Sequence, residues 1–141
     1  MLARTQGLQR QKGRSTGTGK GLDRQETMAL SDTVRHQADL LMTAYCERRV
    51  PPHVRDKVRM HHEVQGDSVT LFEDRPHLNK PGEWTHVPIA QFRFDQKSGR
   101  WGLYCADRNT QWQFYRKVKR SSDLELLLKA VDADVTGIFF G

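Results

Sequence analysis

Five histidines fall within one stretch of the chain: His53, His61, His62, His77 and His86. A zinc or other transition-metal site would need three or four such side chains to converge. Their spacing matches no closed metal-binding pattern, and the adjacent His61 and His62 would face opposite ways on a strand. We therefore predict hydrogen-bonded or surface histidines, and no metal site.

Acidic side chains are the second group of candidate functional residues. A metal-dependent nuclease or hydrolase places carboxylates beside a lysine on neighbouring strands, where they bind Mg²⁺ and activate water. Glu73 with Asp95 and Lys97 could supply such a set. Turn chemistry explains Asp95 more simply, and no serine or cysteine stands in a recognisable nucleophile–base context. We predict no catalytic residue and no cofactor, and a metal-dependent hydrolase ranks third among the functions we consider.

Aromatic and basic side chains could together form a binding face. Arg93, Tyr104, Tyr115 and Lys117 stand at alternate positions of expected strands and could share the sheet face that points away from the helices. Single-stranded nucleic acid binds such faces by base stacking and phosphate contacts. However, the chain has no RNA-recognition signature, and tyrosines often cover a core with the hydroxyl in water. A single-stranded nucleic-acid-binding module therefore ranks second.

Three further aromatic residues are candidates for contact with a protein. Trp84 lies in a loop that contains Pro81 and Gly82, and tryptophan is enriched at binding hot spots. Phe139 and Phe140 end the chain, and because exposed phenylalanines are unfavourable we expect them to dock on the core or on a partner. The first-ranked function is thus a non-catalytic binding or accessory module that engages a protein partner. The sequence leaves the oligomeric state open.

The basic charge is unevenly distributed along the chain. The 141 residues carry a formal net charge of +6, of which +4 lies in residues 1–27. The remaining residues are almost balanced, which argues against a strong phosphate-binding surface on the folded part. The first 27 residues have no periodic apolar pattern, so we predict a disordered basic tail, and we leave open that Met28 is the true start.

Composition and cysteine content indicate the cellular compartment in which we expect the protein. No apolar run approaches the roughly 20 residues that a membrane helix needs, and the polar N-terminus does not resemble a secretory signal. The two cysteines, Cys46 and Cys105, form no CxxC pair. We predict two free thiols in a reducing compartment, with a Cys46–Cys105 disulfide as the alternative that the sequence leaves open, and we expect a cytoplasmic protein with no membrane partner.

The pattern of apolar residues predicts an α+β fold. Helical spacing is seen over Ser31–Val50 and over Ser121–Asp132, where Ser122 and Glu125 could form a capping box. Period-two alternation and flanking turn residues predict strands between the helices, at 58–64, 68–73, 89–94, 101–105 and 112–118, with a loop over 74–86. We expect one domain over residues 28–141: an antiparallel meander of about five strands, with the N-terminal and C-terminal helices packed on it.

Four segments carry a resemblance to a known family. They are VPPHVRDKVR, PGEWTHVPIAQFRFD, GRWGLYCADRN and the ending DADVTGIF. Over roughly residues 34–141 the chain resembles a bacterial family known as domain of unknown function 3024. The resemblance implies a small bacterial domain, and it implies no activity, cofactor or site.

Overall fold

The computed structural model describes residues 29–141, and the predicted tail over residues 1–27 lies outside this range. The elements follow one another as helix, five strands and helix, with one short 3-10 turn. In chain order they are α2 (Asp32–Arg49), η1 (Pro52–Val54), β2 (Arg59–Gln65), β3 (Ser68–Pro76), β4 (Trp84–Asp95), β5 (Arg100–Ala106), β6 (Trp112–Phe114) and α3 (Leu124–Ala133).

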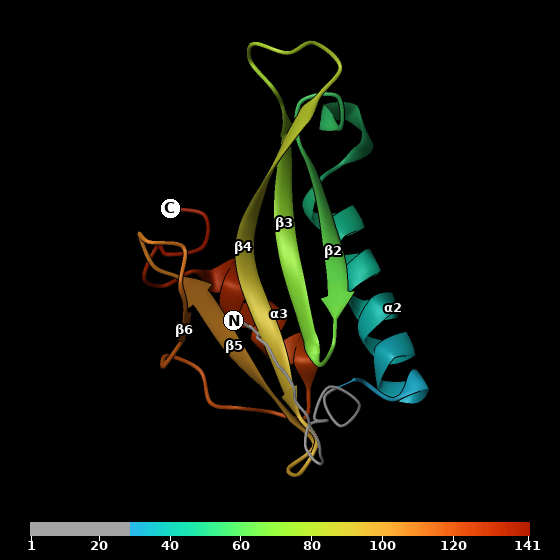
Figure 1. Ribbon diagram of the computed structural model, residues 1–141, viewed down its shortest axis with the longest axis vertical. Coiled ribbons are helices and arrows are strands. Elements are labelled where there is room, and N and C mark those ends of the chain that lie inside the picture. Colours follow the sequence, from blue (N-terminus) through green and yellow to red (C-terminus); the bar gives the residue numbers. More distant parts are fainter. Residues whose placement is uncertain (1–28) are drawn as a thin grey trace, which may run out of the picture.

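The five strands form one antiparallel sheet in the order of the sequence, β2-β3-β4-β5-β6 (Figure 1). Short turns connect β2 to β3 and β4 to β5, as the glycines in the sequence predict, and Gly66 and Gly99 both have positive φ there. The register of β3 against β4 shifts between Leu71 and Phe72. Because Leu71 pairs with Ala90 and Phe72 with Pro88, the residue between them on β4 is a β-bulge.

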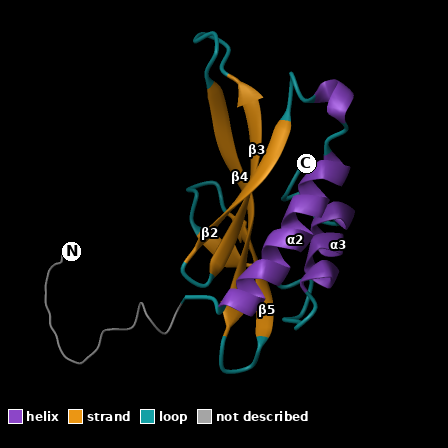
Figure 2. Ribbon diagram, turned by 90° about the vertical axis from the view of Figure 1, so that its right-hand side faces the viewer, coloured by secondary structure: helices purple, strands orange, loops and turns teal. Residues whose placement is uncertain are grey.

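Both helices cover the same face of the sheet and leave the other face open (Figure 2). Met42 and Tyr45 of α2 are buried with Leu127 and Val131 of α3, against sheet residues such as Phe92. These side chains recur at three- and four-residue steps on the helices, so each helix presents one apolar stripe to the sheet. The predicted α+β architecture is confirmed.

The helix ends follow from local capping. Ser31 accepts a hydrogen bond from the Val34 amide and begins α2. At the start of α3 the cap is Asp123, whose carboxylate accepts from the Glu125 amide, so the predicted capping box of Ser122 and Glu125 is wrong. Asp123 is the residue directly before the helix, and from this position its carboxylate reaches the free amide of Glu125. Neither helix of residues 29–141 has the length and apolar character that a membrane crossing requires.

The connection between β3 and β4 is shorter than the predicted loop over 74–86. Asp74 pairs with His86, and the ladder continues to Pro76 and Trp84. The loop is therefore limited to residues 77–83. The prediction failed here because most of the paired residues are polar, and such residues give no apolar alternation.

The C-terminal segment folds back onto the core. Asp134 ends α3 in the left-handed region at φ 44°, and its carboxylate accepts hydrogen bonds from the amides of Phe139 and Phe140. Phe139 packs edge-on against Tyr115 with ring centroids 4.9 Å apart. Of the two outcomes expected for the terminal phenylalanines, docking on the core or on a partner, the structure shows the first.

Candidate functional site

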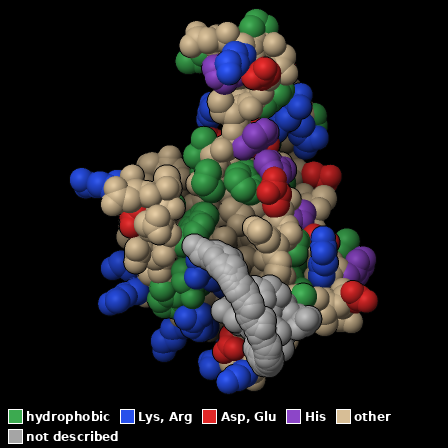
Figure 3. Space-filling model, viewed as in Figure 1, with side chains coloured by type: hydrophobic (Ala, Val, Ile, Leu, Met, Phe, Trp, Pro, Cys, Tyr) green, Lys and Arg blue, Asp and Glu red, His purple; other side chains and the backbone are tan. Residues whose placement is uncertain are grey.

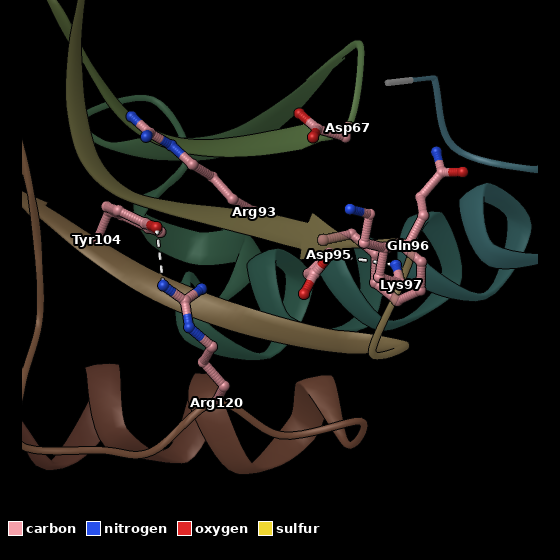
Figure 4. Close-up of a pocket in the computed structure, with 8 residues that line it drawn as sticks. Asp67, Arg93, Asp95, Gln96, Lys97, Tyr104 and Arg120 are labelled. Atoms are coloured by element: carbon pink, nitrogen blue, oxygen red, sulfur yellow. Dashed lines mark hydrogen bonds between the residues drawn. The ribbon is translucent and has the colours of Figure 1, made fainter. Parts of the chain in front are cut away.

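The open face of the sheet carries a pocket of about 540 Å³ near the turn between β4 and β5 (Figure 4). Arg93 comes from β4, Tyr104 from β5 and Arg120 from the segment that leads into α3. Lys97 and Gln96 line it from the turn. Because these residues are held on three different elements of the rigid sheet and its connection, their relative positions are fixed by the fold.

Two guanidinium groups lie over aromatic rings in this pocket. Arg93 is centred 4.1 Å above the Tyr104 ring, and Arg120 lies 4.6 Å above the Phe114 ring. The two rings meet edge-to-face with centroids 5.6 Å apart, and a guanidinium nitrogen of Arg120 donates to the Tyr104 hydroxyl at 3.4 Å. A guanidinium stacked on a ring keeps its N–H edge free for a planar anion. We call these four side chains the cationic pocket.

A row of polar side chains orients Arg93. The Gln91 side chain donates to the hydroxyl of Thr70 at 3.0 Å, and its carbonyl accepts from Nε of Arg93 at 2.7 Å. Within the part of the chain that the structure describes, arginine–carboxylate ion pairs involve Arg35, Arg48 and Arg75. Arg93 and Arg120 form none there, so their charge is available to a ligand.

Gly102 makes room for the second guanidinium. A Cβ atom placed at this position on β5 would stand 2.5 Å from a terminal nitrogen of Arg120 and 3.3 Å from the Phe114 ring. Glycine inside a strand often marks such a close approach. Gly102 is thus a sequence signal that could have predicted a side chain packed closely over β5, the place that Arg120 takes.

The acidic residues of the pocket are engaged in turns. Hydrogen bonds from Ser98 and from the Lys97 amide, with the charge of Arg120, hold the pKa of the Asp95 carboxyl below its usual range. Asp67 accepts from the Ser68 hydroxyl, and its backbone carbonyl accepts from the Phe94 amide. Hydrogen bonds in the turns thus engage both carboxylates.

The structure brings together only part of the predicted aromatic and basic face. Arg93 and Tyr104 are in contact on the open face, as expected. The prediction is wrong for Tyr115. Phe114 pairs with Tyr104 and takes the open face, so Tyr115 points into the core. Lys117 lies exposed in the turn after β6.

The other three predicted binding residues lie within the fold. Trp84 begins β4, half-buried beneath Arg59, whose guanidinium is 3.9 Å from the centre of the indole ring. Phe139 is buried, and Phe140 is partly buried beneath Arg49 at 4.2 Å. These contacts are intramolecular, so none of the three presents an open aromatic surface.

A second group of functional side chains lies further along the same face. Nδ1 of His61 and Nδ1 of His86 each lie 2.6 Å from a different oxygen of the Asp74 carboxylate. Asp74 is only 6 % exposed, although it was predicted to be a loop residue. Partial burial lowers the pKa of His61, but hydrogen bonds and charge from Asp74 and Glu63 outweigh it, so that pKa is raised. His61 and His86 are thus hydrogen-bonded histidines, as predicted, and they meet at one shared carboxylate, which their spacing in the sequence does not predict.

The positions of the other candidate residues follow from the strand register. His62 faces the helices, where Nε2 lies 2.8 Å from a carboxylate oxygen of Asp39, so His61 and His62 do point to opposite faces. Glu73 pairs in register with Val87, far along the sheet from Asp95 at the other end of β4. The carboxylate set considered for a Mg²⁺-dependent hydrolase is therefore not assembled.

Comparison with known proteins gives one match. The model of the family described as Domain of unknown function (DUF3024) matches residues 30–141. No curated protein and no solved structure matches the chain.

Proposed function

This chain belongs to the DUF3024 family, whose description assigns no activity, and we propose from the geometry of the chain a non-catalytic module that binds an acidic segment of a partner protein. The observation that carries the proposal is the pair of ring-stacked guanidinium groups of Arg93 and Arg120, neither of which forms an ion pair with a carboxylate of residues 29–141. A partner carboxylate can take two parallel N–H donors from one such group.

The pocket favours carboxylate over a stacked base. The rings of Tyr104 and Phe114 each already have a guanidinium over one face, which leaves less aromatic surface for base stacking. The almost balanced charge of the chain beyond residue 27 also suits a single anionic contact better than a run of phosphates. Single-stranded nucleic acid is therefore the competing outcome of the test.

The two cysteine thiols indicate the cellular compartment that we propose for this module. Cys46 and Cys105 are free and buried, and burial raises the pKa of the Cys46 thiol to about 11. Buried neutral thiols suit a reducing environment, and we place the module in the cytoplasm, in a bacterial cell as the family resemblance implies.

Peptide binding to the full-length protein tests the proposal. A fluorescein-labelled peptide rich in Glu and Asp is titrated with protein, beside the same peptide carrying Gln and Asn and beside single-stranded oligothymidine. We expect the acidic peptide alone to bind, with an affinity that falls as salt rises. Loss of one charge-assisted contact costs about 1.5–3 kcal/mol, so Arg120→Ala and Arg93→Ala should each weaken binding about ten- to a hundredfold.

Arg35→Ala is the matched control. It removes the same charge from the exposed surface of α2, on the helix side of the sheet, where its carboxylate neighbour Asp39 is also exposed. The affinity of this variant should equal that of the wild type. If oligothymidine binds more tightly than the peptide and only the pocket variants reduce it, the nucleic-acid function replaces this one. Equal losses in all three arginine variants would refute a specific pocket.

A further inference from the structure

We propose that His61, Asp74 and His86 form a binding site for a divalent first-row transition metal, zinc above all, on the open face of the sheet. The three side chains come from the adjacent strands β2, β3 and β4. One ligand atom from each lies within 4.8 Å of the other two. This inference concerns a site separate from the cationic pocket and does not depend on the function proposed for that pocket.

The carboxylate of Asp74 holds the two imidazoles in place. Its oxygens lie 2.6 Å from the two Nδ1 atoms, one oxygen for each ring. An imidazole nitrogen this close to a carboxylate oxygen shares either a hydrogen or a cation with it. Ligands about 2.1 Å from a zinc ion stand roughly 3.4 Å apart, so the cluster needs to open by on the order of 1 Å to admit the ion.

The other nitrogen of His61 is also engaged. Nε2 lies 3.1 Å from a carboxylate oxygen of Glu63, while the ring stacks on Phe72 with centroids 4.8 Å apart and planes within 6°. When Nε2–H donates to Glu63, the lone pair of Nδ1 is directed at the metal position. A carboxylate behind a metal-binding histidine commonly fixes the ring and its tautomer in this way.

The ligand set selects the kind of metal. Two imidazole nitrogens and one carboxylate oxygen suit zinc and its first-row neighbours, whereas Mg²⁺ and Ca²⁺ prefer oxygen alone. The side chain of His86 is 55 % exposed, so the site is accessible from solvent and a fourth position stays open. Three protein ligands with one open position are typical of exchangeable or catalytic zinc sites rather than closed structural ones.

The site and the cationic pocket lie at different places on one face. His86 and Arg93 are seven residues apart on β4, on the order of 20 Å at the rise of a strand. Figure 3 shows histidine and acidic side chains gathered over the upper part of β2–β4 on this face. A substitution in one site therefore leaves the other in place, and the two proposals can fail separately.

Zinc titration of the untagged full-length protein tests the inference. The protein is stripped with a chelator and titrated with Zn²⁺ by isothermal titration calorimetry, and Co²⁺ is added in a parallel experiment to record its visible absorption bands. We expect one ion per chain, no heat with Mg²⁺, and Co²⁺ bands that indicate nitrogen and oxygen ligands. Zinc should also raise the melting temperature, because it binds the folded state alone.

Exposed histidines supply the variants and the control. His86→Gln removes a half-exposed ligand and should fold normally, as thermal unfolding without metal would confirm; its zinc affinity should fall at least about tenfold. His61→Gln should do the same. His36→Gln changes an exposed histidine of α2 and should bind zinc like the wild type. Absence of saturable zinc binding, or wild-type affinity in His86→Gln, would overturn the proposal.

Discussion

Gly102→Ala is a substitution that moves Arg120 without changing any charge. The added methyl group would stand 2.5 Å from the terminal nitrogen of Arg120, which is the flexible end of an exposed side chain. We expect the guanidinium to leave the Phe114 ring and the Tyr104 hydroxyl. The Phe114 ring, at 3.3 Å, needs to shift by only a few tenths of an ångström. The substitution thus tests whether the position of Arg120, and not its charge alone, creates the anion site.

The expected change in stability is small because two effects oppose each other. Gly102 has no positive φ, so alanine fits the strand backbone and stabilises the fold by about 0.4–1 kcal/mol through the unfolded state. Loss of the guanidinium–ring contact at an exposed site costs about 0.5–1 kcal/mol. The net change should stay within about 1 kcal/mol, which is a shift of a few degrees in melting temperature. Affinity for the acidic peptide should nevertheless fall about tenfold.

A double-mutant cycle with Arg120→Ala isolates the cause. The four proteins are compared by peptide anisotropy titration and by urea unfolding. In the Arg120→Ala background no guanidinium remains to be displaced, so Gly102→Ala should cause no further loss of affinity. The alanine should there show its stabilisation of about 0.4–1 kcal/mol unopposed.

The same cycle can refute the reasoning. If Gly102→Ala weakens peptide binding equally in both backgrounds, the effect passes through the strand or the Phe114 ring and not through Arg120. If it costs more than about 2 kcal/mol in the Arg120→Ala background, where the Phe114 ring remains close to the new methyl group, the position is overpacked and the assumed small shift of that ring is wrong.

Three further predictions concern the fold. Leu127→Ala on the buried stripe of α3 should cost about 2–5 kcal/mol in urea unfolding, whereas Leu126→Ala, half exposed on the same helix, should change stability by less than about 0.5 kcal/mol. Tyr45→Phe removes a hydroxyl that donates to Asp132 at 2.7 Å and should cost about 1.5–3 kcal/mol, an effect that vanishes in a double mutant with Asp132→Ala. Although partial burial raises the pKa of Asp134, hydrogen bonds from the C-terminal amides outweigh it and lower that pKa in the folded state. Its stabilising effect is therefore complete above the unfolded pKa of about 3.9 and is lost as pH falls through the lower folded value, so the stability difference between wild type and Asp134→Asn should vanish in acid.

The sequence predicts the elements because their signals are local. The helical spacing of Met42 and Tyr45 and the run of leucines in α3 identify the two covering helices. Glycine-containing turns separate β2 from β3 at Gly66 and β4 from β5 at Gly99 without ambiguity. Strand boundaries were lost where polar residues pair, as at Asp74 and His86, since pairing of that kind leaves no apolar pattern.

The candidate sites were harder to predict because they depend on register. Tyr104 and Tyr115 each stand at an alternate position of a strand, and sequence alone does not say which residue of β6 faces Tyr104. The structure pairs Phe114 with Tyr104, so Tyr115 is buried and Phe114 lies beneath Arg120 on the open face. A prediction of the pocket would have required the register of β5 against β6, which side-chain pattern does not fix when both faces carry aromatics.

The bulge on β4 is the feature that places both sites on one face. On a regular strand residues an odd number apart face opposite sides, and His86 and Arg93 are seven apart. The extra residue between the partners of Leu71 and Phe72 reverses the alternation, so both side chains point away from the helices. Without it, one of the two would face the helices, and either Asp74 would lose an imidazole or Tyr104 its guanidinium. The one sequence signal in that stretch is Pro88, directly before the bulged Ile89, since proline inside a strand is confined to edges and bulges. The open face thus acquires its two sites from a backbone irregularity, which proline alone would not distinguish from a strand edge and which the β3–β4 register places at Ile89.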